Sequence, residues 1–595
     1  MKLNLDPTLD GRWPNAGVTP FLPPLEVLRS EIDDIDDQIL SLLEQRYAIV
    51  RRVSLAKAND APATLPLRPW RERQIVERLS ARANHVPTQD VTHIWRSILS
   101  LSAQYQRSYR VTLWAPDTAR VALARLAAAR FGTAVPLAWA VSAEQAIAAA
   151  QNGDSIVLIP ADQMQPSQAP ELDLIGQYPL DCPDHPWALA MGRIAPEAKA
   201  PVTDWRPASW KQRVHHQLPV YRDSPLLAIV EGQLARSEPV VCAEAMAALA
   251  AELVEAQQGR RLLIQAGECA EPIDGARSDT IAMSELVNQL ADGLERGTGS
   301  QIIRVGRIAG QFAKPRSASV EQSGGERLAV YRGDAVNQPG ASAAARTADP
   351  RRLNDAYAQS RRVSEWLAEQ AADAGTGHRA LFTSHEALLL NYEAALTRLS
   401  AQDGRWWAGS AHSLWLGDRT RDPLGAHVEY LSGIANPVGI KCGPSIDADE
   451  LMTLLDRIDA GRTPGRIMLV ARIGHERVAE RLGRLMEAVR DAGHPALWLC
   501  DPMHGNNRSI DGVKTRLVPD LVAEVEQFVA VARSAGVHPG GLHLEITPEP
   551  VLECVDNLAH AHPERRYGSR CDPRLNPEQA MHIVDRFAAA LGAGR

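Results

Sequence analysis

From about residue 205 to the end of the chain, strand-like apolar runs alternate with amphipathic helical patterns. Strands are predicted at 262–267, 302–310, 380–385, 413–417, 438–443, 467–474, 497–502 and 542–547. Eight strands, each followed by a helix, predict a β/α barrel with reactive residues at the carboxyl ends of the strands. A doubly wound open sheet is the alternative. The segment at 313–350, rich in Gly, Ser and Ala, is too long for a routine connection, so we expect a functional loop or an inserted element.

The first hundred residues are helical in pattern. One long helix is predicted at about 24–58, where Leu28, Ile32, Ile35 and Ile39 recur every three or four positions, and two shorter helices follow up to residue 107. This is too little chain for a compact bundle, so we expect a homodimer or a higher homo-oligomer.

The next segment changes character. Between 109 and 200, three strands alternate with two Ala-rich helices, which is the usual start of a parallel sheet, and no catalytic constellation occurs there. The chain is therefore predicted to be multidomain: an all-α domain at 21–107, a small α/β domain at 109–200 acting as a spacer or a regulatory unit, and a C-terminal (β/α)8 TIM barrel at 205–595.

Composition excludes several classes of protein. With 64 Lys and Arg against 72 Asp and Glu, the net charge of −8 argues against nucleic acid as a partner. No apolar run reaches the roughly 18 residues of a membrane helix, and the first residues lack the apolar core of a signal peptide. We therefore expect no membrane partner and a cytoplasmic location. The seven cysteines are scattered without CxxC spacing and do not indicate a disulfide framework.

The predicted strand ends carry four side chains that suit a divalent metal. They are a thiol, an imidazole and two carboxylates: Cys269, His504, Glu545 and Asp572. Together they can surround a cation and leave room for a substrate oxygen, and zinc, manganese, cobalt and iron(II) all tolerate such a mixed set. The alternative is a buried cysteine and histidine with carboxylates that pair elsewhere.

A second set at the strand ends is cationic. Its members are Arg304, Arg307, Lys314, Arg316, Arg419, Arg421, Lys441 and Arg472. Because inward-facing cations are costly unless an anion meets them, their recurrence predicts a multiply anionic substrate.

Eight motifs in this part of the chain resemble one enzyme family. GRIAGQFAKPRS, YRGDAVN, RLNDAY, TSHEALLLNYE, NPVGIKCGPS, CDPMHGNN, GGLHLEITPEPVLEC and CDPRLN are similar to motifs of the class II (plant-like) 3-deoxy-D-arabino-heptulosonate 7-phosphate (DAHP) synthases, over about 390 residues from near Trp205. The resemblance implies a β/α barrel that condenses phosphoenolpyruvate with erythrose 4-phosphate in the shikimate pathway.

The resemblance also implies roles for individual residues. Cys269, His504, Glu545 and Asp572 become the ligands of a divalent metal, with Mn2+ favoured and Co2+, Zn2+ or Fe2+ compatible. The phosphoenolpyruvate site falls on Arg307, Arg419, Lys441 and Arg472, with Lys314 and Trp415 nearby, and the sugar phosphate on Arg316 and Ser317. Asp418 stands where the family usually has Glu. Oxidation is expected to join Cys269 to Cys571 and to expel the metal.

The long N-terminal helix carries cations at informative positions. Arg46 lies in the apolar seam, and Lys57 is about 20° round the helix and about 16 Å further on, so both can reach one pocket. Arg29 is about 25 Å from Arg46 and about 100° off that face, so it could serve only the pocket of a partner chain. On the last helix, Ser102 and Gln106 share a face.

Residues 21–107 resemble the all-helical (AroQ-type) chorismate mutases. The resemblance implies a chorismate site made of Arg29 from the partner chain, Arg46, Lys57, Arg71, Glu72, Ser102 and Gln106. Arg68 stands where a bacterial relative has Asp. The rearrangement is pericyclic, so orienting the substrate and stabilising charge at the ether oxygen are sufficient.

The sequence as a whole predicts a bifunctional enzyme of aromatic biosynthesis acting on phosphoenolpyruvate, erythrose 4-phosphate and chorismate. Two alternatives concern the helical part: a non-catalytic sensor of chorismate or prephenate that controls the barrel, or a module that only dimerises. The middle segment faintly resembles a lobe of prephenate dehydratase-like domains.

Overall fold

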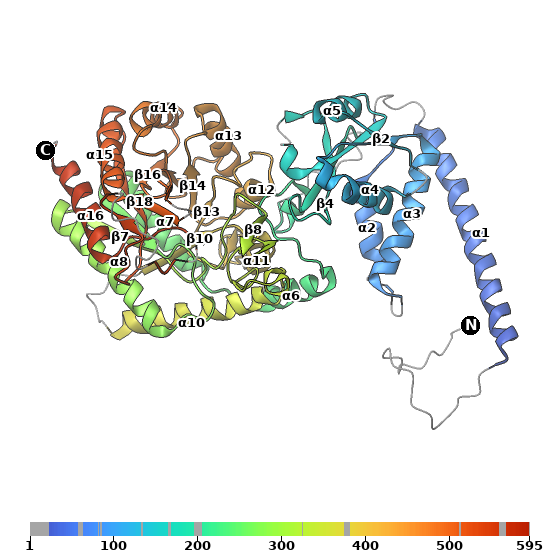
Figure 1. The fold of residues 1–595 in the computed structure, drawn as a ribbon, viewed down its shortest axis with the longest axis horizontal. Coiled ribbons are helices and arrows are strands. Elements are labelled where there is room, and N and C mark those ends of the chain that lie inside the picture. The colour runs from blue at the N-terminus through green and yellow to red at the C-terminus, as the bar shows by residue number, and fades with distance from the viewer. Residues whose placement is uncertain are drawn as a thin grey trace, which may run out of the picture.

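The computed structural model describes residues 23–57, 64–80, 82–83, 86–132, 135–164, 168–194, 205–323, 325–373, 381–510, 513–557, 567–569 and 571–593. A helical region, a small sheet domain and a barrel follow one another along the longest axis of the molecule (Figure 1). In the described part of the chain, no helix combines the length and apolar character needed to cross a membrane.

The helical region consists of α1 (Leu25–Lys57), α2 (Pro69–Ser80) and α3 (Thr88–Gln106), which confirms one long and two shorter helices. The apolar stripe of α1 is left largely uncovered: Ile32, Leu42 and Ile49 remain 57%, 63% and 58% exposed. Helices normally bury such a stripe, so α1 presents a face suited to another chain.

The small domain is a five-stranded mixed sheet. Its strands are β1 (Arg110–Leu113), β2 (Leu137–Trp139), β3 (Ser155–Pro160), β4 (Asp173–Pro179) and β5 (Trp187–Gly192), in the order β2-β1-β3-β5-β4. The three predicted strands are parallel, but β5 runs antiparallel to both β3 and β4. The expectation of a parallel sheet with three strands was therefore incomplete, because Pro and Gly around β4 and β5 obscure their pattern.

The two faces of this sheet meet different parts of the protein. One face packs against α4 (Asp117–Phe131) and, through Ala103, against α3. The other packs against α5 (Ala143–Gln151) and against Val214, which belongs to the segment leading into the barrel. The sheet is thus a layer between the helical region and the barrel.

The closed barrel contains the eight predicted strands in chain order, all parallel. They are β6 (Arg261–Gly267), β7 (Gln301–Arg307), β10 (Leu381–Glu386), β13 (Ser413–Leu416), β14 (Val438–Cys442), β15 (Ile467–Ala471), β16 (Ala496–Cys500) and β19 (Pro539–Glu545). An open doubly wound sheet is thereby excluded. The helices following these strands are α8 (Arg277–Thr298), α10 (Arg352–Asp373), α11 (Leu390–Leu396), α12 (Ala426–Gly433), α13 (Ala448–Ile458), α14 (Val478–Asp491), α15 (Val518–Ser534) and α16 (Pro577–Gly592).

Alternation along the strands determines which side chains enter the barrel. Ile303 and Val305 of β7 pack in one cluster with Leu263, Met468 and Leu497 from the other strands. Side chains two apart share a face of a strand, so the residue that follows Val305 by two positions, at the carboxyl end, also faces inward. The barrel therefore has an apolar floor and presents the last inward residue of each strand at its mouth.

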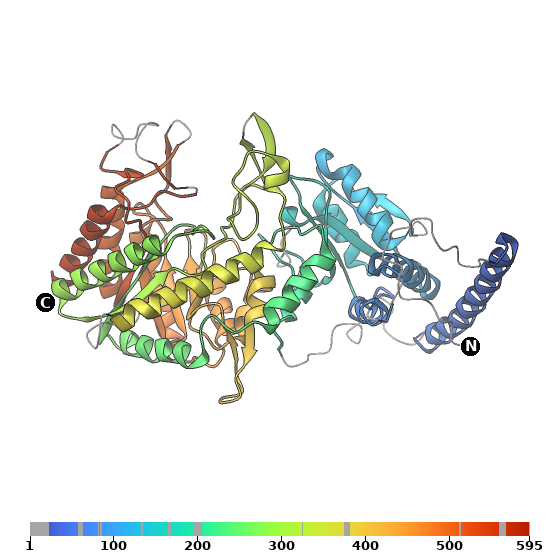
Figure 2. The ribbon, with the colours of Figure 1, turned by 90° about the horizontal axis from the view of Figure 1, so that it is seen from below.

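The segment at 313–350 is an inserted element, as expected. It holds a hairpin of β8 (Val320–Ser323) and β9 (Glu326–Ala329) and a short helix, α9 (Ala343–Arg346). In Figure 2 this hairpin stands out from the barrel beside the small sheet domain. Smaller elements complete the fold: α6 (Ser224–Arg236), α7 (Ala243–Gln257), β11 (Thr397–Leu399), β12 (Trp406–Ala408), β17 (Arg508–Ile510), β18 (Val513–Leu517) and β20 (Cys554–Val555).

Candidate active site

The predicted metal ligands come together at the barrel mouth. Ligand atoms of Cys269, Glu545 and Asp572 lie within 4.8 Å of one another, and all three residues are buried. His504 joins them, since its Nε2 is 3.0 Å from Oε1 of Glu545 while its Nδ1 is 2.8 Å from Oδ2 of Asp501. A carboxylate on the far nitrogen is the usual support of a metal-binding histidine, because it fixes the ring and its tautomer.

A cation is already accommodated among these donors. The Nζ of Lys314 is 2.5 Å from Oδ2 of Asp572 and 3.3 Å from Oε1 of Glu545, and it also contacts Sγ of Cys269. Burial opposes ionisation of Asp572, but the charge of Lys314 holds the pKa of this carboxyl well below its usual range. The donor set therefore concentrates negative charge in a buried position, as a divalent cation requires.

The predicted phosphoenolpyruvate residues surround this cluster. Arg307 donates to Oε1 of Glu545 (3.1 Å), and Nζ of Lys441 is 2.6 Å from Asp501. The Trp415 ring lies 5.2 Å from the Arg307 guanidinium and 5.8 Å from the Lys441 ammonium, so it provides an apolar wall between them.

Two further cations complete the rim. Arg472 donates to Asp418 (2.6 Å) and to the carbonyl of His504 (2.9 Å). Arg419 donates to Oγ of Ser317 (2.7 Å), which joins the predicted phosphoenolpyruvate residues to the predicted sugar-phosphate residues. The shorter acid Asp418 is thus held between Arg472 and Arg421, the latter at 3.0 Å.

One cation of the predicted set is not at the mouth. Arg304 extends outward and contacts Asn288 (3.2 Å) and Asp292 on α8. It precedes Arg307 by three positions on β7, and alternation puts the two side chains on opposite faces of the sheet. The expectation that Arg304 belongs to the anion site was wrong.

The structure also places His543 at the centre of the site, which the sequence reasoning missed. Arg307 donates to Nε2 of His543 (2.7 Å), and Nδ1 of His543 is 2.7 Å from Oε1 of Gln265. Because a guanidinium can only donate, Nε2 must accept, and Nδ1 must carry the proton that it gives to Gln265. Burial, followed by the charges of Lys441 and Arg307, lowers the pKa of His543 well below its usual value, in agreement with a neutral ring.

Glu386 was likewise missed. It ends β10, and its buried Oε1 has no hydrogen-bond partner among the described residues. Burial raises the pKa of this carboxyl, and the charges of Lys441, Lys314, Arg419 and Arg307 oppose the rise. A Cβ at Gly417 would lie 2.1 Å from Oε1, so only glycine allows the carboxyl to adopt this position.

The two cysteines of the predicted disulfide lie in one cluster with Tyr331, both as free thiols. Burial and the neighbouring Cys571 thiol raise the pKa of Cys269, whereas a hydrogen bond with Cys269 lowers the pKa of Cys571 to about 7. The geometry is compatible with the disulfide hypothesis, which stays a prediction.

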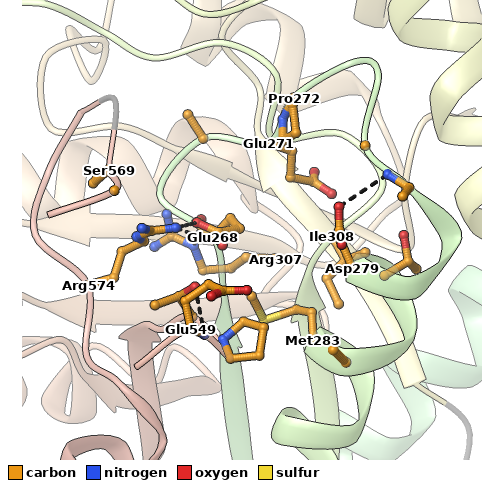
Figure 3. Close-up of a pocket in the computed structure, with 18 of the residues that line it drawn as sticks. Glu268, Glu271, Pro272, Asp279, Met283, Arg307, Ile308, Glu549, Ser569 and Arg574 are labelled. Atoms are coloured by element: carbon orange, nitrogen blue, oxygen red, sulfur yellow. Dashed lines mark hydrogen bonds and ion pairs between the residues drawn. The ribbon is translucent and has the colours of Figure 1, made fainter. Parts of the chain in front are cut away.

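A cavity of about 490 Å³ lies beside this cluster and is lined by Cys571, Arg307 and residues at the start of α8 (Figure 3). Its wall includes the ion pair of Glu268 with Arg574 (2.9 Å). Glu271 is not free to bind a ligand, because it accepts three backbone N–H groups, from Ala309, Gly310 and Gln311. This side of Arg307 is mainly acidic and suits a phosphate less well than the cationic rim.

In the helical region, three predicted chorismate residues meet. Arg46 of α1 donates to Oγ of Ser102 on α3, and the amide of Gln106 donates to the carbonyl of Ser102 (3.3 Å). The buried Oε1 of Gln106 has no hydrogen-bond partner in the part of the chain that the structure describes. The side chain of Lys57 lies outside the described residues.

The other predicted chorismate residues are not gathered at this position. Arg29 is exposed, as a residue serving a partner chain would be, and Arg71 is exposed as well. Glu72 is 3.4 Å from Arg130 of α4, which also donates to the Tyr178 hydroxyl of β4 (2.8 Å). Glu72 therefore forms a contact between the helical region and the small sheet domain.

Fold and site together define a β/α barrel with a buried cluster of side chains that could hold a metal ion, beneath a cationic rim. Comparison with known families agrees. A model described as "Class-II DAHP synthetase family" matches residues 205–376 and 363–588, and one described as "Chorismate mutase type II" matches residues 28–107. The chain belongs to the class II DAHP synthetase family and carries an N-terminal chorismate mutase type II domain.

Individual relatives cover the barrel. A "Probable phospho-2-dehydro-3-deoxyheptonate aldolase" of Pseudomonas fluorescens is 42% identical over 379 residues, which is 63% of this chain and 94% of that protein. A phospho-2-dehydro-3-deoxyheptonate aldolase of Streptomyces coelicolor is 35% identical over 427 residues, 63% of this chain and 95% of that protein. A third, from Mycolicibacterium smegmatis, is 37% identical over 409 residues, 59% of this chain and 88% of that protein.

Proposed function

We propose that the chain is a bifunctional enzyme. The barrel joins phosphoenolpyruvate to erythrose 4-phosphate with water, giving DAHP and phosphate, and the helical domain converts chorismate to prephenate. The observation that carries the first activity is the convergence of Arg307, Arg419, Lys441 and Arg472 above a buried cluster of metal ligands.

Cys269, His504, Glu545 and Asp572 would hold a divalent metal, with Mn2+ favoured and Co2+, Zn2+ or Fe2+ compatible. Such an ion would supply Lewis acidity toward the aldehyde oxygen of erythrose 4-phosphate. His543 keeps Arg307 oriented, and Arg307, Arg419, Lys441 and Arg472 bind the phosphate and carboxylate of phosphoenolpyruvate in the attack geometry. C3 of phosphoenolpyruvate then attacks the aldehyde carbon, water adds to C2, and phosphate leaves.

Glu386 is proposed to accept a proton or a hydrogen bond at this stage, because its partnerless Oε1 faces the cationic rim. We expect Glu386→Gln to lower kcat by about 10²–10⁴-fold, the usual contribution of a positioned acid or base, with little change in KM for phosphoenolpyruvate. Steady-state kinetics measure both. Glu393, which pairs with His385 (2.9 Å) on the outer side of the same strand, gives the control: Glu393→Gln should lower thermal stability and leave kcat unchanged.

The charge of Lys441 is expected to set an upper pH limit for DAHP formation. Burial lowers the pKa of its ammonium to about 8, against the attraction of Asp501. The group is charged below this pH and loses its charge as the pH rises through it, so kcat/KM for phosphoenolpyruvate should fall above about pH 8. In Lys441→Arg the charge persists, and the decline should move to higher pH. An unchanged profile in that variant would show that another group sets the limit.

For the mutase activity, Arg46, Lys57, Arg71, Ser102 and Gln106 are proposed to bind chorismate, with Arg29 supplied by a second copy. Glu72, assigned to this site by resemblance, could take part only if it also left or shared its contact with Arg130. The exposed stripe of α1 supports a homodimer or higher homo-oligomer in which a partner covers this face.

The proposed domains are 21–107, 109–200 and 205–595, and we place the protein in the cytoplasm, where the pathway's substrates occur. An alternative function for the helical domain is a non-catalytic sensor, favoured by the contact of Glu72 with the small sheet domain rather than with Arg46. The sensor would be supported if prephenate changes the rate of DAHP formation and the protein shows no chorismate mutase turnover.

The test is a paired assay of the purified chain for both reactions, with and without a chelator. We expect the chelator to abolish DAHP formation, Mn2+ to restore it, and prephenate formation to continue throughout. Absence of DAHP formation with every divalent metal tried would contradict the proposal.

A further inference from the structure

The backbone at Gln217 has a left-handed conformation that side chains rarely adopt. Its φ is 66°, and it belongs to the segment that joins the small sheet domain to the barrel. Strained backbone of this kind persists where surrounding contacts enforce it, and it is common at functional positions. The contacts that hold Gln217 in this conformation therefore indicate a functional role for this residue.

Gln217 holds the loop that carries the predicted sugar-phosphate residues. Its side-chain Oε1 accepts the backbone N–H of Arg316 (2.8 Å), and its carbonyl oxygen accepts from Nη1 of Arg332 (2.7 Å). Arg316 and Arg332 lie on either side of the β8–β9 hairpin. Gln217 thus contacts both ends of the β8–β9 hairpin, next to Lys314 and Ser317.

The residues beside Gln217 are bound by the small sheet domain. The Gln177 amide on β4 accepts the backbone N–H of His215 (2.8 Å) and donates to the carbonyl of the same residue (2.7 Å). Nε1 of Trp187 on β5 donates to the carbonyl of Leu218 (3.1 Å). Gln217 therefore lies between His215 and Leu218, whose backbones are held by the neighbouring strands β4 and β5.

The connection between β4 and β5 reaches the inserted element directly as well. The carbonyl of Asp184 accepts from Oγ of Ser319 (3.0 Å), and its carboxylate pairs with Arg327 on β9. Figure 2 shows the hairpin of β8 and β9 beside the sheet domain. The small domain thus contacts the inserted element at Ser319, before the hairpin, and at Arg327 within the hairpin.

We propose that Gln217 is a positioning residue for the loop at 314–319, and that strands β4 and β5 of the small domain set the affinity of the barrel for erythrose 4-phosphate through it. This rests on the proposed function, in which Arg316 and Ser317 bind the sugar phosphate. Phosphoenolpyruvate binding should change less, although Arg419 contacts Ser317, because Arg307 and Lys441 lie on barrel strands and Lys314 is held separately by its backbone hydrogen bond to the carbonyl of Arg332 (2.9 Å). A displacement of about 1 Å in a positioning group can cost as much as a hundredfold in rate.

The test compares Gln217→Ala with Gln217→Glu. The alanine removes the acceptor of the Arg316 N–H, whereas glutamate keeps an acceptor oxygen at the same reach. We expect Gln217→Ala to raise KM for erythrose 4-phosphate at least tenfold and KM for phosphoenolpyruvate less than twofold, with Gln217→Glu close to the wild type. Equal increases in both KM values, or none, would overturn the proposal.

Gln177→Ala tests the part played by the small domain. We expect the same shift in KM for erythrose 4-phosphate, smaller in size, because the Trp187 contact remains. The matched control is Asp181→Ala, which removes the exposed ion pair with Arg222 (3.5 Å) in the same β4–β5 connection. A Gln177→Ala enzyme with wild-type KM values would remove the small domain from the proposal.

Amide hydrogen exchange provides a readout that does not depend on catalysis. Exchange in peptides covering 314–319 should accelerate in Gln217→Ala and Gln177→Ala, and remain unchanged in Asp181→Ala. Unchanged exchange in both variants would refute the positioning role even in an inactive protein. If exchange accelerates in the variants but the unmodified protein forms no DAHP, the positioning role stands and the proposed function is wrong.

Discussion

Replacement of Cys269 by alanine should lower DAHP formation by about a thousandfold. The thiol is one of three ligand groups within 4.8 Å of one another, and its loss leaves an incomplete site for a divalent cation. Lewis-acid activation contributes several kcal/mol, and about 4 kcal/mol corresponds to a factor of a thousand in rate. Metal content after gel filtration, measured together with the rate, should fall from near one ion per chain to a small fraction.

Cys242 provides the control for this substitution, since its thiol is free and exposed and the residue precedes α7, the helix before the first barrel strand. Cys242→Ala should keep both its metal and its rate. Mutase turnover in Cys269→Ala should match the wild type, because the helical region shares no described contact with the metal ligands. A fully active Cys269→Ala enzyme with bound metal would contradict the ligand assignment.

Gln106→Ala should lower chorismate mutase turnover by about 10²–10³-fold, the usual effect of losing one donor to a developing charge. Its amide already lies beside Ser102, which Arg46 contacts, and its side-chain oxygen is buried. KM for chorismate should change less than kcat, because the carboxylates of chorismate would still meet Arg46. Spectrophotometric loss of chorismate measures both.

Gln45→Ala is the matched control, since Gln45 lies on the exposed surface of α1, one residue before Arg46. It should leave mutase kinetics unchanged. Wild-type turnover in Gln106→Ala would reject the assigned role, and absence of turnover in the unmodified chain would favour the sensor. The synthase rate should be the same in both variants in the absence of chorismate and prephenate.

The barrel could be predicted from the sequence because its strands are short apolar runs separated by amphipathic helices, a pattern that depends only on local periodicity. The strands β4 and β5 could not, since Gly176 and neighbouring prolines interrupt the pattern. Their pairing with β3 depends on contacts distant in the chain.

Two site residues were missed although they lie inside quoted motifs: His543 in GGLHLEITPEPVLEC and Glu386 in TSHEALLLNYE. Alternation along the strands would have identified both. His543 lies two residues before Glu545, and Glu386 lies two after Ser384, so both face the interior of the barrel. Applying the same rule to β7 would have removed Arg304 from the anion site. Glu72 was assigned by resemblance, and its contact with Arg130 could not be foreseen because it joins two domains.

Strand β4 contacts both neighbours of the small domain through consecutive residues. Tyr178 meets Arg130, which reaches Glu72 of α2, and Gln177 holds the backbone of His215. Consecutive side chains of a strand point to opposite faces. A small rotation of β4 about its axis would therefore move the Tyr178 contact and the Gln177 contact in opposite directions. Thermodynamic linkage makes such coupling between the two sites reciprocal. If a ligand of the helical domain changes the affinity of the barrel for erythrose 4-phosphate, then erythrose 4-phosphate must change the affinity of the helical domain for that ligand by the same factor.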